Sequence, residues 1–158
     1  MKYTVYIDHG NGEILGEEVG KEDLKKIDVK SLRLSPVEFQ NERFFKALGM
    51  VESNNDPVAI GDGGKARGIY QLWKIYVDDV NRIYGTSYIH DDAYNETKAR
   101  EIVTAYLTYW RHDPEGKCDK VENYGHLAVL HNMGGPEYWK RAHYVSKFIH
   151  YSKTTENP

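Results

Sequence analysis

Cysteine is almost missing from this sequence of 158 residues. Cys118 is the single one, so no disulfide can form within the chain and a disulfide-held scaffold is excluded. A metal cluster held by several thiolates is excluded for the same reason. We therefore expect an apolar core, rather than covalent cross-links, to hold the fold together.

Long hydrophobic runs are missing as well, and so is an excess of positive charge. Residues 1–7 alternate between apolar and polar and lack an apolar signal core, which predicts synthesis in the cytoplasm without a signal peptide. No run is long enough to span a membrane. The formal net charge of −3, with no basic stripe, argues against nucleic acid as the main partner.

What is present predicts one packed domain of the α+β class that is mostly helical. Hydrophobic residues make up 40% of the chain, enough for a single sizeable core. Aromatic residues reach 13%, including 13 tyrosines, which suits either sugar-binding faces or a tyrosine-rich core. We expect residues 1–34 to form a β-hairpin and connector, 35–151 the main domain and 152–158 a frayed tail.

Local signals place the elements along the chain. Alternation over residues 3–7 followed by Asn11-Gly12 predicts the hairpin, and a short helix follows near 22–26. Ser35-Pro36-Val37-Glu38 has the pattern of a capping box with proline at the first helical position. Helical spacing predicts a helix from 35 to about 53 and further helices over 71–84, 95–111, 119–131 and beyond the Gly134-Gly135-Pro136 break. The glycines over 61–68 predict a loop or a tight hairpin.

Glu52 breaks two local rules. It lies seven residues after Phe45 and four after Leu48, so it shares their apolar helix face. It also lies at the C-terminal end of the helix, where the macrodipole disfavours a negative charge. Both effects favour a carboxyl group that keeps its proton, as a general acid requires. The alternative is a glutamate that turns outward as the helix frays.

Three blocks of sequence resemble one enzyme family. Residues 48–72, LGMVESNNDPVAIGDGGKARGIYQL, are similar to the catalytic motif of soluble lytic transglycosylases and goose-type lysozymes. Residues 95–107, NETKAREIVTAYL, resemble that family's Asn-led helix ending in Tyr-Leu. His131-Asn132-Met133-Gly134-Gly135-Pro136 resembles its Tyr-Asn-Ala-Gly segment. The blocks occur in the family's order and span roughly 37–150, whereas 1–34 have no counterpart.

The resemblance implies a lysozyme-like fold with a glycan cleft between a helical lobe and a small β-hairpin lobe. It implies cleavage of the β-1,4 bond between N-acetylmuramic acid and N-acetylglucosamine in peptidoglycan, with Glu52 as the general acid. No cofactor or metal is implied. The positions implied to bind substrate are Ser53, Tyr70, Gln71, His131 and Asn132.

Asp62 bears on the type of reaction. Hydrolysis uses a second carboxylate, whereas a transglycosylase uses the substrate's own C6 hydroxyl and leaves a 1,6-anhydro ring. Asp62 follows Glu52 by ten residues, where transglycosylases commonly carry a small residue. It is a candidate second catalytic carboxylate, although Asp-Gly-Gly is also ordinary turn chemistry. Two other departures are a loop one residue longer than usual and histidine in place of tyrosine at 131.

Other polar groups have simpler interpretations. The pairs at 78–79 and 91–92, the latter beside His90, are better explained as solvated faces and a helix start than as metal ligands. Lys25, Lys26, Lys30 and Arg33 form a modest basic cluster of the kind found on a solvated surface. The segment 8–12 lacks the spacing of a calcium loop and is expected to be a hairpin tip.

Three functions remain open at this level. The first is a peptidoglycan-cleaving enzyme that reaches the wall after release, in a virion or by a dedicated export route. The second is an inactive carbohydrate-binding or virion structural module. The third is a glycosidase on the same scaffold that cuts chitin-like polymers. The oligomeric state is left open.

Overall fold

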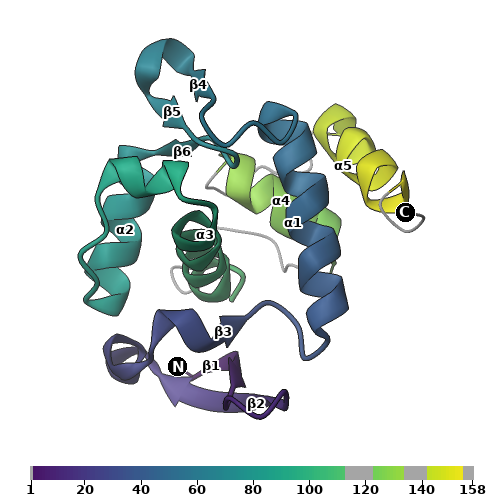
Figure 1. Ribbon diagram of the computed structural model, residues 1–158. Helices are drawn as coiled ribbons and strands as arrows, with labels where there is room; N and C mark the ends of the chain where they lie inside the picture. The colour runs from purple at the N-terminus through teal and green to yellow at the C-terminus, as the bar shows by residue number, and fades with distance from the viewer. Residues whose placement is uncertain (1, 113–122, 134–141, 155–158) are drawn as a thin grey trace.

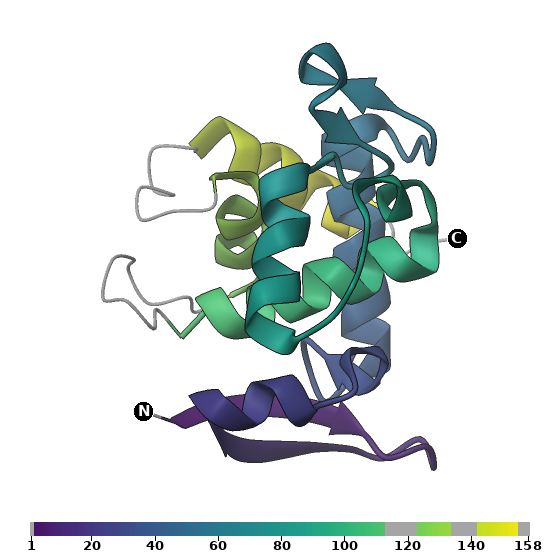
Figure 2. The same ribbon diagram turned by 90° about the vertical axis from the view of Figure 1, so that its left-hand side faces the viewer.

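The computed structural model describes residues 2–112, 123–133 and 142–154. Within them the chain is a mainly helical α+β protein with two small three-stranded sheets. Figures 1 and 2 show the two sheets at opposite ends of a helical body. The predicted fold class is therefore confirmed.

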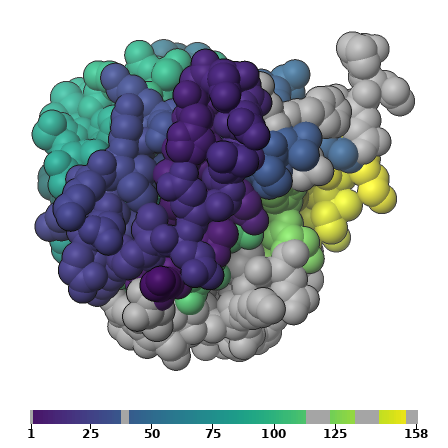
Figure 3. Space-filling model, turned by 90° about the horizontal axis from the view of Figure 1, so that it is seen from below, coloured from purple at the N-terminus to yellow at the C-terminus, as the bar shows by residue number. Residues whose placement is uncertain are grey.

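The N-terminal sheet contains strands β1 (Lys2–Asp8), β2 (Ile14–Gly20) and β3 (Leu32–Arg33) in the order β2-β1-β3, all antiparallel. The 3₁₀ helices η1 (Lys21–Lys26) and η2 (Val29–Ser31) connect β2 to β3. This confirms the predicted hairpin and the short helix near 22–26. Tyr3 and Val5 are buried in the same core as the helices, so the sheet closes one face of the body (Figure 3).

The second sheet follows helix α1 (Glu38–Ser53) and is built from two-residue strands. Strands β4 (Ile60–Gly61), β5 (Ala66–Arg67) and β6 (Leu72–Trp73) pair in that order, and the 3₁₀ turn η3 (Asp62–Gly64) lies at the tip of the β4–β5 hairpin. The remaining described elements are α2 (Lys74–Tyr84), η4 (His90–Tyr94), α3 (Glu96–Trp110), α4 (Tyr124–Met133) and α5 (Ala142–Thr154).

The helix ends follow local signals in several places. Asn95 caps α3, since its side chain accepts the backbone N–H of Lys98 at 3.0 Å. Asn54 and Gly85, both left-handed, end α1 and α2 as predicted. The predicted capping pair at 119 and 122, the break at 134–136 and Cys118 lie outside the described residues.

Three predicted boundaries are wrong. Helix α1 begins at Glu38, because the Ser35 hydroxyl accepts the N–H of Val37 and forms a turn before the helix. Helix α2 begins at Lys74 rather than 71, because residues 72–73 pair with β5. Helix α5 continues to Thr154, three residues into the expected tail.

Two apolar side chains whose spacing fits the buried faces of the predicted helices are exposed. Val37 precedes the first turn of α1, and Ile75 lies on the outer side of α2 with 75% of its surface exposed. Val77 takes the place of Ile75 in the core. In the described part of the chain, no helix is both long and apolar enough to cross a membrane.

Candidate active site

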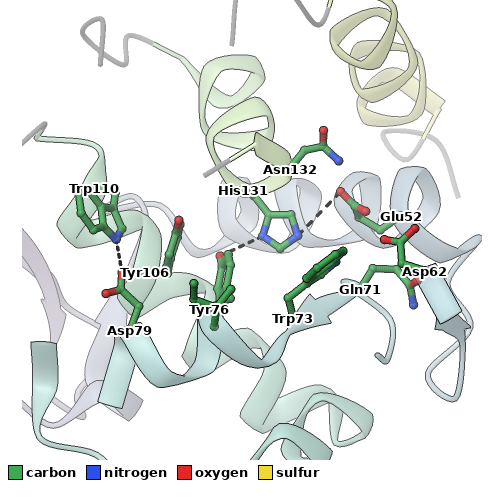
Figure 4. A pocket seen from close by; sticks show the side chains of 11 residues that line it. Glu52, Asp62, Gln71, Trp73, Tyr76, Asp79, Tyr106, Trp110, His131 and Asn132 are labelled. Carbon is green, nitrogen blue, oxygen red and sulfur yellow. Dashed lines mark hydrogen bonds and ion pairs between the residues drawn. The ribbon is translucent and has the colours of Figure 1, made fainter. Parts of the chain in front are cut away.

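A groove of about 880 Å³ lies between the β4–β6 sheet and the helical body (Figure 4). Residues from six helices, strands and turns, or from their ends, line the groove. Some of them are 80 positions apart in the sequence. Five of the seven predicted site residues lie on it. The lining residues are Glu52, Asp62, Gln71, Trp73, Ile75, Tyr76, Asp79, Tyr106, Trp110, His131 and Asn132.

Glu52 occupies one end of the groove, on the last turn of α1. Its side chain is 11% exposed. The Tyr144 hydroxyl, from α5, donates a hydrogen bond to Glu52 Oε1. Burial, and then the neighbouring Glu52 carboxylate, raise the pKa of Tyr144, so the phenol remains a donor at any ordinary pH. The carboxyl group therefore lies in a nearly closed site and faces a neutral donor.

His131 is the second neighbour of Glu52. Its Nε2 lies 2.8 Å from the carbonyl oxygen of Tyr70, which can only accept, so Nε2 carries the proton. The Tyr76 hydroxyl then donates to Nδ1 at 2.9 Å. Burial lowers the pKa of His131, which keeps the ring neutral near pH 7. Nε2 is 3.8 Å from Glu52 Oε1, so the ring is a neutral neighbour of the acid.

Both ring nitrogens of His131 are thus engaged within the protein. The side chain is only 3% exposed, which leaves its ring edge and not a free nitrogen on the groove wall. Asn132, the next residue, is exposed and projects toward the Glu52 end (Figure 4). Of this predicted pair, Asn132 is the one with a side chain available to a ligand.

The hairpin forms the opposite wall at the Glu52 end. Asp62 is exposed at its tip, and Figure 4 shows its carboxyl group at the same end of the groove as that of Glu52. Gln71 has a left-handed backbone with φ of 52°, and its side-chain amide donates to the carbonyls of Gly68 and Ala59 at 2.9 and 3.3 Å. These bonds hold the hairpin against the start of β6.

The backbone around Gly68 leaves no room for a side chain at this position. Its φ is 78°, and a Cβ there would lie 1.9 Å from the carbonyl oxygen of Ala93. Any side chain would push the hairpin away from η4. The wall that carries Asp62 and Gln71 thus depends on this close backbone approach.

Ser53 and Tyr70 are not among the lining residues. The Ser53 hydroxyl donates to the carbonyl of Ile69 at 2.7 Å and ties the end of α1 to the hairpin return. Tyr70 is 1% exposed, and its hydroxyl accepts from Arg100 Nε at 3.1 Å, away from the groove. The structure brings both residues next to the site but gives their side chains internal contacts.

The groove floor is aromatic, a feature that the sequence did not reveal. Tyr76 stacks on Tyr106 with ring centroids 3.7 Å apart, and Trp110 follows at 6.2 Å from Tyr106. Trp110 Nε1 donates to Asp79 Oδ2 at 2.7 Å at the far end. Trp73, 41% exposed, lies nearer Glu52 (Figure 4). Tyr76, Tyr106 and Trp110 fit the apolar spacing of their helices, and that spacing does not distinguish a core from the lining of a groove.

The acidic pairs and the histidine that were considered as metal ligands have structural partners. Asp78 pairs with Lys74, Asp91 pairs with Arg67, and Asp92 accepts the N–H of Ile89. His90 Nε2 lies 2.8 Å from the carbonyl of Leu72, to which it donates. Within the described ranges, no three His, Cys, Asp or Glu side chains gather as a metal site.

Comparison with known proteins adds no relative. No protein family, curated protein sequence or solved structure matches the chain. The geometry of the groove is therefore the main guide to function, together with the three sequence blocks.

Proposed function

We propose that this protein is a glycosidase that cleaves the β-1,4 bond between N-acetylmuramic acid and N-acetylglucosamine in peptidoglycan, with Glu52 as the general acid. One observation carries the proposal, which is the position of the Glu52 carboxyl group. It is 11% exposed, faces two neutral groups, and opens onto an aromatic-floored groove.

The surroundings of Glu52 suit proton donation. The Glu52 carboxyl group is largely removed from water and has no cationic partner among the described residues. In the reaction Glu52 gives its proton to the glycosidic oxygen as the bond to the anomeric carbon breaks. The Tyr144 hydroxyl then donates to the carboxylate that remains.

Asp62 supplies the second carboxylate of a hydrolase. It projects into the same end of the groove from the other wall, where an ionised carboxylate takes the proton of a water that attacks the anomeric carbon. Glu52 and Asp62 then act as acid and base on opposite sides of one bond. This arrangement favours hydrolysis over anhydro-ring formation.

The aromatic floor suits a polysaccharide. Trp73, which is 41% exposed, offers a flat apolar area to the C–H face of a sugar, whereas Tyr76 and Tyr106 are stacked on each other and mostly buried. Hydrogen-bonding groups beside an aromatic ring bind hydroxyl groups. Asn132 and Asp79 offer such groups at the two ends of the row. The groove thus extends beyond a single sugar.

The decisive test is Glu52→Gln, which keeps the side-chain shape and removes the transferable proton. We expect the rate of cell-wall solubilisation to fall by about a hundredfold or more, because general acid catalysis contributes about 10²- to 10⁴-fold. Glu18→Gln, an exposed change on β2, is the matched control and keeps the full rate. Wild-type rates in Glu52→Gln would exclude the proposed acid.

Asp62→Asn and product analysis test the reaction type. We expect at least a tenfold loss of rate, and muropeptides that contain the added water by mass spectrometry. Products one water lighter, with little effect of Asp62→Asn, would assign a lytic transglycosylase instead. Parallel incubation with N-acetylglucosamine oligomers separates a muramidase from a chitin-cutting enzyme, and no cleavage of either would leave a binding module.

A further inference from the structure

Lys65 lies beside the groove in an unusual position. It follows the Asp62–Gly64 turn and is exposed to solvent. Its Nζ lies 5.6 Å from the ring centroid of Trp73, within the range of a cation–π contact. Because Trp73 lines the groove and is 41% exposed, the ammonium group is held at the groove entrance near the Glu52 end.

The other cations of this region already have acidic partners. Arg67 pairs with Asp91 at 2.7 Å, Lys74 pairs with Asp78 at 2.6 Å, and Arg82 pairs with Asp79. Within the described ranges, Lys65 has no carboxylate within ion-pair distance, and its partner is the neutral indole. An ammonium group held by a ring alone keeps its charge available for a ligand.

We propose that Lys65, held over Trp73 at the groove entrance, binds a carboxylate of the substrate and selects anionic muramyl glycans over neutral N-acetylglucosamine polymers. The inference rests on the proposed function and names the substrate class of the same groove. Muramic acid carries a lactyl carboxyl group, which is either free or continued by a peptide stem with its own carboxylates. Chitin-type polymers carry neither.

The position of Trp73 makes this selection local to the cleaved bond. A sugar that packs on the exposed indole brings its substituents toward the ammonium group that rests on the same side chain. A carboxylate there gains an ion pair, whereas a neutral acetamido sugar gains only the apolar contact. Trp73 thus serves both kinds of substrate, and Lys65 serves the anionic one.

The test compares Lys65→Met with Lys74→Met. The second variant is the control, because it removes one positive charge from the residue that follows Trp73, where the lysine is paired with Asp78. The substrates are intact cell walls, peptide-free glycan strands with free lactyl carboxylates, and N-acetylglucosamine oligomers. For Lys65→Met we expect kcat/KM on anionic substrates to fall about threefold to fivefold, as for one exposed ion pair. The loss lies in KM, disappears at high salt and spares the neutral oligomers. Lys74→Met leaves all three substrates unchanged.

The two anionic substrates identify the source of the carboxylate. A loss on the peptide-free strands alone assigns the lactyl carboxylate, which is a neutral amide wherever a peptide stem is attached. A loss on intact walls alone assigns the carboxylates of the peptide stem, and a loss on both assigns a site that accepts either carboxylate. Equal losses on neutral oligomers, or no loss on any substrate, would overturn the inference. Trp73→Leu is the second variant, and it should weaken cleavage of neutral and anionic glycans alike.

Binding separates this inference from the proposed catalysis. Affinity for each glycan is measured in the Glu52→Gln background, with and without Lys65→Met, so the readout needs no turnover. If the wild-type protein cleaves no glycan while Lys65-dependent binding of anionic strands persists, the proposed catalysis fails and the carboxylate site stands. If the protein cleaves glycans but Lys65→Met does not change their binding, the proposed carboxylate site is wrong and the proposed catalysis stands.

Discussion

The two ends of helix α1 hold a glutamate in opposite ways. Glu42, near the start, accepts a two-pronged interaction from Arg100, at 2.6 and 3.0 Å, and its side chain is 46% exposed. Glu52, ten residues later, is 11% exposed and faces a tyrosine and a neutral histidine. The same residue type on the same helix is stabilised as a charge at one end and enclosed without a counter-charge at the other.

The difference lies in the partners that surround each carboxyl group. Hydrogen bonds from Arg100 lower the pKa of Glu42, so it stays ionised and joins α1 to α3. Between the two sites lies Tyr70, whose hydroxyl accepts from Arg100 and whose carbonyl accepts from His131. One buried residue thus contacts Arg100 on one side and His131, which lines the groove, on the other.

The largest effect that we expect is at the Glu52 end. Tyr144→Phe removes the hydroxyl that donates to Glu52 and leaves the ring in place. Losing a donor to a developing carboxylate should lower kcat by about tenfold to thirtyfold, equal to roughly 1.4–2 kcal/mol. Steady-state rates on cell walls measure this. Tyr151→Phe, on the same helix, is the control, and an equal loss there would indicate a general effect on α5.

The next effect is at the Glu42 end. Arg100→Met removes the cation from Glu42 and the donor from the Tyr70 hydroxyl, and should reduce the free energy of unfolding by about 1–2 kcal/mol. Activity at 25 °C should stay within about threefold, because no part of Arg100 lines the groove. Denaturant titration and wall assays check both. An unchanged stability with a collapsed rate would reverse the assignment of the two ends.

Acid sensitivity of the groove side comes next. The pKa of His131 is lowered in the folded state, so its stabilising contribution is complete above the unfolded value of 6.5 and is lost as pH falls through it. The loss is at most about 1.4 kcal/mol per pH unit between pH 6.5 and the folded pKa. In the His131→Gln variant, the free energy of unfolding should depend less on pH in this window. A remaining slope comes from His112, whose pKa burial also lowers.

The smallest effect belongs to Glu42. Because its folded pKa is lowered, its contribution is complete above the unfolded value of 4.5 and is lost as pH falls below it. Its exposure limits the contribution to about 1 kcal/mol or less. The difference in unfolding free energy between wild type and Glu42→Gln should therefore shrink between pH 5 and pH 3. A constant difference would mean that the variant acts through packing.

Local signals predicted most of the fold. The Asn95 cap, the apolar spacing of α3 and the left-handed stops at Asn54 and Gly85 all act within a few residues, so the sequence contains them directly. The starts of α1 and α2 were misplaced because they depend on Ser35 turning back on Val37 and on β6 pairing with β5. Such competition between turn, strand and helix is decided by tertiary contacts.

The site was predictable in part. The apolar helix face and the three sequence blocks together singled out Glu52, and the blocks also pointed to Asp62, Gln71, His131 and Asn132, which line the groove with it. Tyr144 was missed because it is 92 positions from Glu52 and no local feature links the two. The aromatic floor was missed because a buried helix face and a groove lining share the same spacing.

The long separation between Glu52 and Tyr144 also orders events during synthesis. A ribosome completes the Glu52 helix and the whole hairpin long before residue 144 emerges, and helix α5 can pack on α1 only afterwards. Until then Glu52 has no phenol beside it and one side of its enclosure is open to water. A nascent chain therefore carries Glu52 well before it carries the phenol that encloses and hydrogen-bonds its carboxyl group.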